Sequence, residues 1–126
     1  MDVRVLTTSR ETDVKTTWLA GRSHYEELLA AGVRIFEYQP TMMHAKSLVV
    51  DGIWGTVGTM NFDNRSMVFN DESNLVMLDA GLGAQLDSIF HEDTKYSKEI
   101  RLDEFRRRPW YQKVVETGAS LFSRLL

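Results

Sequence analysis

Residues 44–61 read HAKSLVVDGIWGTVGTMN, in which two apolar, β-branched runs flank Asp51-Gly52. Asp-Gly between such runs is a strong signal for a two-residue hairpin, because both turn positions tolerate positive φ. We therefore predict an antiparallel hairpin in which Val50 lies opposite Ile53. This register decides which side chains share a face of the sheet.

The predicted register brings four polar side chains together. His44 and Lys46 are two residues apart on one strand and therefore point to the same face. Counting back from the turn places His44 directly opposite Thr59, and directly opposed residues share a face. Asn61, two residues beyond Thr59, joins them if the strand continues. A three-residue turn would reverse this parity, so the expected cluster depends on the turn.

The expected cluster suits a phosphate group. A lysine and neutral hydrogen-bond donors stabilise charge on non-bridging oxygens, and an imidazole can attack phosphorus or protonate a leaving oxygen. Without an anion between them, His44 and Lys46 would disfavour each other's positive charge. Gly58 permits close approach of the backbone. We therefore predict a phosphodiester site.

A histidine and lysine two apart are commonplace on an exposed strand edge, so the prediction depends on the longer pattern. That pattern is His44-x-Lys46, then Asp51, then Gly58-Thr59-x-Asn61. With each residue type at about one in twenty, six fixed positions match by chance roughly once in tens of millions of windows. The longer pattern therefore indicates a built site.

Composition sets limits on the fold and on the partners. At 126 residues the chain has room for one domain, and the absence of cysteine excludes disulfides and zinc–thiolate sites. A formal net charge of −3 argues against broad binding to a nucleic-acid backbone. The basic run 106–108 is typical of a solvated face. No apolar run approaches the roughly 18 residues of a membrane helix, so we expect a soluble chain.

Hydrophobic periodicity predicts an α/β fold with a mixed β-sheet flanked by helices. Residues 3–8 and 33–38 read as strands around one helix that carries Trp18 and Leu29 and stops at Gly32, a unit that favours parallel pairing. A strand at 74–78 and a helix from Leu82 follow the hairpin. The amphipathic segment 112–126 is typical of a helix that packs on the core, and a membrane anchor is the alternative.

The pattern resembles the HKD signature of the phospholipase D superfamily. The stretches Asn-Phe-Asp-Asn-Arg-Ser at 61–66, Asn-Asp-Glu at 70–72 and Ala-Gly-Val-Arg-Ile-Phe-Glu-Tyr at 31–38 are similar to the C-terminal half of bacterial cardiolipin synthases. The similarity runs from Val3 to Leu126. The resemblance implies a two-step transfer through a covalent phosphohistidine, without a metal or another cofactor, at an active site where two HKD motifs meet.

The resemblance also assigns roles. His44 is implied to be the nucleophile or the general acid, and the catalytic set is His44, Lys46 and Glu72. His44, Lys46, Thr59 and Asn61 are implied to hold phosphate oxygens, and Glu72 to orient the histidine through its other ring nitrogen.

Other positions of the motif are expected to be structural. Asp51 matches the aspartate of the motif, at the turn, and Gly58 belongs to the motif backbone. Thr59 replaces the commoner serine of the family and keeps the hydroxyl.

Two departures from the family pattern shape the expected domain organisation. The chain has one HKD motif, and the strand and helix that usually begin the family domain have no counterpart before Asp2. We expect residues 1–126 to form a single-motif phospholipase D-like domain lacking that first strand and helix, the C-terminal half of a two-motif enzyme.

The expected function is a phosphatidyltransferase half-domain that makes cardiolipin from phosphatidylglycerol. The alternatives are a phospholipase, a single-motif dimeric phosphodiesterase or nuclease, and an inactive isolated fragment. The expected partners are phosphatidylglycerol, a second HKD half in the parent chain or a homodimer, and the bacterial cytoplasmic membrane for the parent protein. The acidic net charge disfavours nucleic acid.

Overall fold

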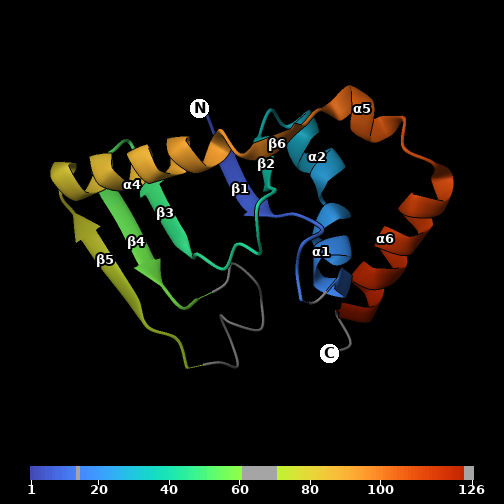
Figure 1. Ribbon diagram of the computed structural model, residues 1–126, viewed down its shortest axis with the longest axis horizontal. Helices are drawn as coiled ribbons and strands as arrows, with labels where there is room; N and C mark the ends of the chain where they lie inside the picture. Colours follow the sequence, from blue (N-terminus) through green and yellow to red (C-terminus); the bar gives the residue numbers. More distant parts are fainter. Residues whose placement is uncertain (14, 61–70, 124–126) are drawn as a thin grey trace. The chain divides into compact units, whose positions relative to one another are not determined.

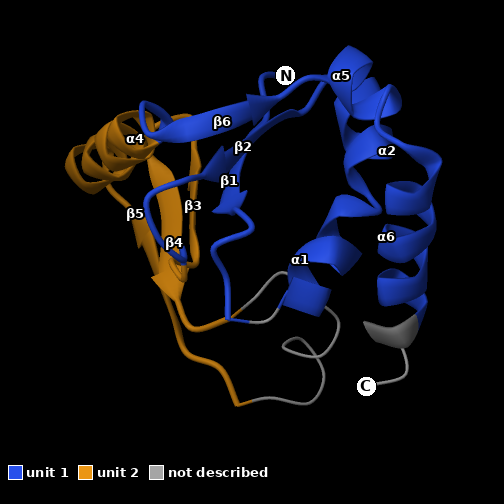
Figure 2. Ribbon diagram, turned by 45° about the vertical axis from the view of Figure 1, so that its right-hand side comes forward, with its two compact units in different colours: residues 1–43, 94–126 blue, residues 44–93 orange. Residues whose placement is uncertain are grey.

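A computed structural model describes residues 1–13, 15–60 and 71–123 of the chain (Figure 1). The chain divides into two compact units, which are described separately (Figure 2). The first unit consists of residues 1–43 and 94–126, and the second of residues 44–93. The expectation of a single domain over residues 1–126 stays a prediction.

The first unit contains a mixed three-stranded sheet in the order β1-β2-β6. Its strands are β1 (Arg4–Thr8), β2 (Arg34–Tyr38) and β6 (Ser97–Ile100). β1 and β2 are parallel, as the β-α-β pattern predicted, and β6 runs antiparallel to β2. The apolar core of this unit is built from Tyr25, Ile35, Ile100 and Phe105, with Leu29 and Val33 against it.

The connection between β1 and β2 contains two helices, so the prediction of one continuous helix was wrong. α1 (Lys15–Arg22) and α2 (Tyr25–Ala30) are separated at Ser23. The Ser23 hydroxyl donates to the carbonyl of Ala20 at 2.7 Å, and this local hydrogen bond competes with helix continuation. The predicted stop at Gly32 is confirmed, because Gly32 has a φ of 88° and donates its N–H to Leu29.

The C-terminal part of the first unit is helical. α5 (Leu102–Arg106) is followed by Pro109 and α6 (Trp110–Ser123), and α6 packs along α1. A helix is therefore present where the amphipathic segment was expected, although Val114, Val115 and Leu121 are exposed. No helix in the described ranges is both long and apolar enough to cross a membrane.

The second unit is an antiparallel three-stranded sheet in the order β3-β4-β5, followed by a long helix. Its elements are β3 (Ser47–Val50), β4 (Trp54–Gly58), β5 (Asn74–Leu78) and α4 (Ala80–Thr94). The α/β class and the flanking helices are confirmed, with the strands distributed over two sheets. The first sheet is mixed and the second is antiparallel.

The hairpin forms at Asp51-Gly52, but its register differs by one residue from the prediction. Both turn residues have positive φ, 52° and 65°, as predicted. Val50 nevertheless pairs with Trp54, so Ile53 is a third loop residue. The N–H of Ile53 donates to Val50 at 3.1 Å, while its carbonyl accepts the N–H of Asp79 at 2.9 Å. This bond to Asp79 holds Ile53 in the loop.

α4 begins directly against this turn. A Cβ atom at Gly83 would lie 2.1 Å from the carbonyl oxygen of Gly52, so glycine is required for the contact. Further along, Leu86 lies over Gly55. α4 therefore covers the face of the sheet that carries Gly55 and its cross-strand partner Met77.

Candidate active site

The motif residues gather at the end of the second sheet that lies away from the Asp51-Gly52 turn. The backbone pairing of β3 and β4 continues one step beyond β3, since the N–H of Gly58 donates to the carbonyl of Lys46 at 3.0 Å. Gly58 also pairs with Asn74. In an antiparallel sheet the start of β3, the end of β4 and the start of β5 meet at one edge. Lys46, Thr59 and Glu72 come from these three segments.

Thr59 and Glu72 are joined directly. The Thr59 hydroxyl donates to Oε2 of Glu72 at 2.5 Å and accepts the N–H of Ser73 at 3.0 Å. The N–H of Thr59 donates to the carbonyl of Ser73, also at 3.0 Å. A hydroxyl can donate one hydrogen bond and accept others, so Thr59 uses both capacities here. The Thr59–Glu72 pair is thus a fixed element of this edge.

Lys46 turns back toward the histidine. Its Nζ donates to the backbone carbonyl of His44 at 3.0 Å. His44 itself lies in the exposed segment that precedes β3, and Lys46 is half-buried. The ammonium group is thereby held next to the backbone of His44.

The observed register removes the argument that placed His44 opposite Thr59. Continuing the pairs Ser47–Val57 and Lys46–Gly58 brings Ala45 opposite Thr59 and His44 opposite Met60. The directly opposed pair of His44 and Thr59 was therefore a wrong prediction, caused by the extra loop residue. Both residues still flank the same edge of the sheet, because each lies beyond the end of its strand.

The predicted contact between Glu72 and His44 and the predicted role of Asn61 both stay predictions. Oε2 of Glu72 accepts the Thr59 hydroxyl, an interaction that the sequence did not predict. Asn61 lies outside the described residues, as do the rest of the stretch 61–66 and Asn70. The assignment of Asn61 and of the Glu72–His44 contact stays a prediction.

Sequence reasoning missed Asn74. Its Oδ1 occupies the space above Gly58 and accepts the N–H of Met60 at 3.4 Å. A Cβ atom at Gly58 would lie 1.8 Å from that oxygen and 2.3 Å from the carbonyl of Ser73. Gly58 is therefore needed for β5 to approach β4. The signal in the sequence was an asparagine at the start of a strand that otherwise carries apolar residues.

Asp51 lies at the opposite end of the hairpin from Lys46. It is exposed and has a φ of 52°, a conformation that asparagine and aspartate tolerate better than most residues. Its position in the turn separates it from the other motif residues. Among the described side chains, no group of three or more histidine, aspartate or glutamate residues could hold a metal ion.

Comparison with known families assigns the fold. Residues 1–94 match the family described as "Cardiolipin synthase, PLD-like domain". The chain belongs to this phospholipase D-like family. The resemblance inferred from the HKD pattern is thereby confirmed.

Curated relatives of this phospholipase D-like chain are named cardiolipin synthases. It is 37% identical over 126 residues to the cardiolipin synthase of Halalkalibacterium halodurans, covering 100% of this chain and 25% of that protein. It is 36% identical, again over 126 residues, to cardiolipin synthase A of Pectobacterium carotovorum, covering 26% of that protein. The chain thus spans about a quarter of the length of the curated relatives it matches.

A solved structure supports the phospholipase D-like fold. The phospholipase D family member Nuc from Salmonella typhimurium matches with a TM-score of 0.66 at 16% identity. The match covers 80% of this chain and 65% of that one. At this identity the similarity concerns the fold alone.

Proposed function

We propose that this chain is the C-terminal part of a phosphatidyltransferase that makes cardiolipin from phosphatidylglycerol at the bacterial cytoplasmic membrane. One structural observation supports the proposal most: Lys46 and the Thr59–Glu72 pair occupy one edge of a sheet, next to the exposed His44. The similarity to proteins named cardiolipin synthase, which extends over all of this chain and about a quarter of those proteins, supports the choice of reaction.

The proposed first step replaces an oxygen on phosphorus by a histidine nitrogen. One motif histidine attacks the phosphodiester of phosphatidylglycerol, so that a P–N bond forms and the P–O bond to the headgroup glycerol breaks. The second motif histidine, from a partner HKD half, gives its proton to the leaving alkoxide. His44 takes one of these two roles. Free glycerol and a phosphatidyl-histidine result.

The proposed second step reverses the chemistry with a new acceptor. The headgroup hydroxyl of another phosphatidylglycerol attacks the phosphorus while the second histidine takes the hydroxyl proton. The new P–O bond forms, the P–N bond breaks, and cardiolipin leaves. With water as the acceptor, the same site would be a hydrolase that releases phosphatidic acid.

The other side chains of the proposed site stabilise the negative charge on the phosphate or orient His44. We assign Lys46, Thr59 and Asn61 to the non-bridging oxygens, where a cation and neutral donors stabilise the charge of the transition state. Because a hydroxyl donates one hydrogen bond, Thr59 exchanges its bond to Glu72 for one to the phosphate when substrate binds. A carboxylate can accept several hydrogen bonds. The bond from Thr59 to Glu72 is therefore compatible with Glu72 also orienting the ring of His44.

A chimera tests the proposal, because the chain aligns in full with one quarter of a longer relative. The aligned quarter of the H. halodurans cardiolipin synthase is replaced by this chain, and membranes carrying the chimera are given labelled phosphatidylglycerol. We expect labelled cardiolipin, and a loss of about a thousandfold or more in the His44→Ala chimera. His91→Ala, an exposed histidine outside the motif, is the matched control and should leave turnover unchanged.

The products separate the alternatives. Release of phosphatidic acid without cardiolipin would show a hydrolase and overturn the transferase proposal. A folded chimera that forms neither product, or one whose activity survives His44→Ala, would refute the assignment of His44. Trapping of a phosphatidyl adduct, located by mass spectrometry of tryptic peptides, provides a second measurement that does not depend on the rate of turnover.

A further inference from the structure

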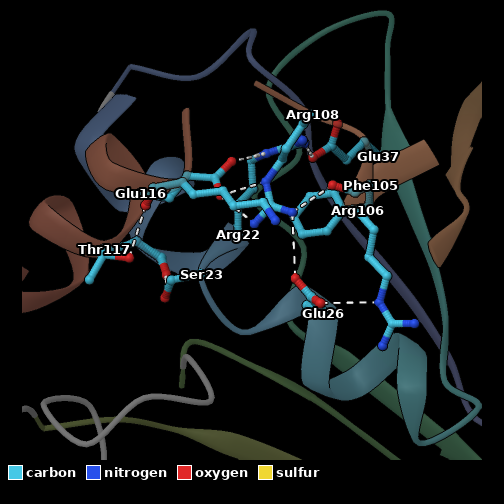
Figure 3. Close-up of polar contacts among 11 residues, drawn as sticks. Arg22, Ser23, Glu26, Glu37, Phe105, Arg106, Arg108, Glu116 and Thr117 are labelled. Carbon is cyan, nitrogen blue, oxygen red and sulfur yellow. Dashed lines mark hydrogen bonds and ion pairs between the residues drawn. The ribbon is translucent and has the colours of Figure 1, made fainter. Parts of the chain in front are cut away.

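α6 packs on the first unit through its polar side. Glu116 is 2% exposed and accepts from Nε of Arg22 at 3.2 Å and from Nη2 of Arg108 at 3.0 Å (Figure 3). At about 100° per residue, Lys113, Ala119 and Ser120 share this side of the helix with Glu116, and all three are half-buried. The helix therefore turns a largely polar side, with Glu116 at its centre, toward its own unit.

The apolar side of α6 is left exposed. The side of the helix away from Glu116 carries Trp110, Val114 and Leu121, and the adjoining side, which lines a groove with α1, carries Tyr111 and Val115. All five of these large apolar or aromatic residues are at least half exposed. We call these five residues the outer stripe of α6. A continuous exposed apolar surface of this kind is unusual on a soluble protein and marks an interaction surface.

Buried ion pairs fix this orientation. Arg22 bridges Glu116 and Glu37, donating to Glu37 at 2.5 Å, and Glu37 is 5% exposed. The guanidinium of Arg22 also lies 5.1 Å above the ring of Phe105 in the core. Rotating α6 to bury the outer stripe would leave the half-buried Arg22 and Arg108 without Glu116, which is itself buried, at a cost in free energy. The stripe therefore faces outward in the folded unit.

We propose that the outer stripe of α6 docks on the surface of a bilayer that contains anionic phospholipids. The helix of 14 residues is about 21 Å long, too short to cross a hydrocarbon core of about 30 Å, so it would lie in the plane of the surface. Trp110 and Tyr111 have the mixed polar and apolar character that suits the headgroup region.

Cationic residues near α6 favour an anionic membrane surface as the partner of the outer stripe. Exposed Arg10 and Lys15 line a groove beside α6 together with Tyr111 and Val115, and Arg107 is exposed just before the helix. Cations beside an apolar stripe match anionic headgroups. A symmetric pair of chains would instead bring these like charges together, which disfavours a second copy as the occupant. The choice of a phospholipid surface rests in part on the proposed function.

Vesicle binding tests the proposal without requiring turnover. The chain is sedimented with vesicles of phosphatidylcholine alone or with one-third phosphatidylglycerol. We expect binding to the anionic vesicles, weakened about tenfold or more by Val114→Ser/Leu121→Ser. The matched control is Leu82→Ser/Ile89→Ser, which removes two apolar side chains of similar exposure from α4 and should bind like the unmodified chain. Circular dichroism confirms that both variants are folded.

Each outcome decides the proposal. Equal loss of binding in the two double variants, or retained binding in Val114→Ser/Leu121→Ser, would refute docking through α6. Absence of vesicle binding together with dimers that Val114→Ser/Leu121→Ser disperses would assign the stripe to a second copy. His44→Ala should bind vesicles normally, so a failed transferase assay and a failed docking assay remain distinguishable.

Discussion

Gly58 allows β4 and β5 to approach each other beside the proposed phosphate-binding residue Thr59. The β4 and β5 backbones approach so closely there that a Cβ atom would lie 2.3 Å from the carbonyl of Ser73. That neighbour is backbone and cannot move aside as a flexible side chain could. The same approach brings Thr59 within hydrogen-bond distance of Glu72 and Ser73.

We expect Gly58→Ala to open the end of the β4–β5 ladder and to lower the free energy of unfolding of the second unit by about 1–3 kcal/mol. Hydrogen–deuterium exchange at the amides of β4 and β5 measures the effect. Gly21→Ala is the control, because a Cβ atom at Gly21 meets nothing within 4 Å and alanine favours the helix. Equal protection in the two variants would show that the close approach is not needed.

Substitutions of Thr59 test whether its hydroxyl contributes to the proposed reaction. Thr59→Val keeps the shape of the side chain but removes the hydrogen bonds to Glu72 and from Ser73. We expect cardiolipin formation by the chimera to fall by about a hundredfold, the scale seen when one donor to developing charge is lost. Thr59→Ser keeps the hydroxyl and should stay within about threefold of the parent. A fully active Thr59→Val chimera would exclude Thr59 from phosphate binding.

At the scale of elements, α6 is held by ion pairs where most helices are held by apolar contacts. Glu116, Arg22 and Arg108 lie in the interior of the first unit, with 3%, 15% and 10% of their side chains exposed. Removing one partner of a buried pair leaves an uncompensated charge, which costs more than the pair contributes when intact.

We therefore expect Glu116→Gln to lower the free energy of unfolding by about 3 kcal/mol in urea titrations. Glu99→Gln removes the same charge from an exposed pair with Arg34, whose side chains are 42% and 47% exposed, and should cost about 1 kcal/mol or less. If the two substitutions cost the same, the ion pairs do not determine the orientation of α6.

Elements that depend on neighbours in the sequence were predictable, and those that depend on distant contacts were not. Positive φ at Asp51 and Gly52 follows from the local preferences of these two residues, and it was predicted. The third loop residue, Ile53, is fixed by two contacts with residues far along the chain. Asp79 donates its N–H to the carbonyl of Ile53, and Gly83 packs against the carbonyl of Gly52. A one-residue error in a hairpin changes which residues lie opposite one another, so the predicted pairing of His44 with Thr59 was wrong, while the cluster itself stays a prediction.

The candidate site shows the same division. His44, Lys46 and Thr59 were chosen from the spacing of the motif, which does not depend on the register of the hairpin, and their roles in the site stay a prediction. The bond between Thr59 and Glu72 joins residues 13 apart across two strands, and no periodicity reveals such a contact. Asn74 was missed because a polar residue at the start of a strand is usually solvated.

At the scale of the whole molecule, this chain carries one motif histidine, whereas the proposed reaction needs two. A histidine that carries the phosphatidyl group cannot also protonate the leaving alkoxide. We expect the isolated chain, held monomeric by dilution and checked by light scattering, to show no transfer and no phosphodiester hydrolysis above background. Turnover by a proven monomer, abolished by His44→Ala, would show that one motif suffices.

Stability of the first unit should depend on alkaline pH through Tyr25. Burial, reinforced by the charge of Glu37, raises the pKa of this phenol well above its ordinary value of 10.0. The unfolded chain releases the proton near pH 10 while the folded unit retains it, so stability is intact below pH 10 and falls as pH rises above it.

We expect the melting temperature to fall between pH 9 and pH 11, and to fall less in Tyr25→Phe, which keeps the ring but has no proton to lose. Tyr96→Phe is the control, because this tyrosine is 56% exposed. An alkaline decrease of equal size in all three proteins would refute the role of Tyr25.

The two units differ in how their residues are distributed along the chain. The second unit is one unbroken stretch, whereas the first is assembled from two stretches on either side of it. During synthesis on a ribosome, the β3–β4–β5 sheet can therefore form as soon as its own residues have emerged. The β2–β6 ladder must wait for residue 100 and must also close a loop of about 60 residues, at an entropic cost of about 4 kcal/mol. The motif-bearing unit can thus be complete in a nascent chain whose other unit still lacks an edge strand.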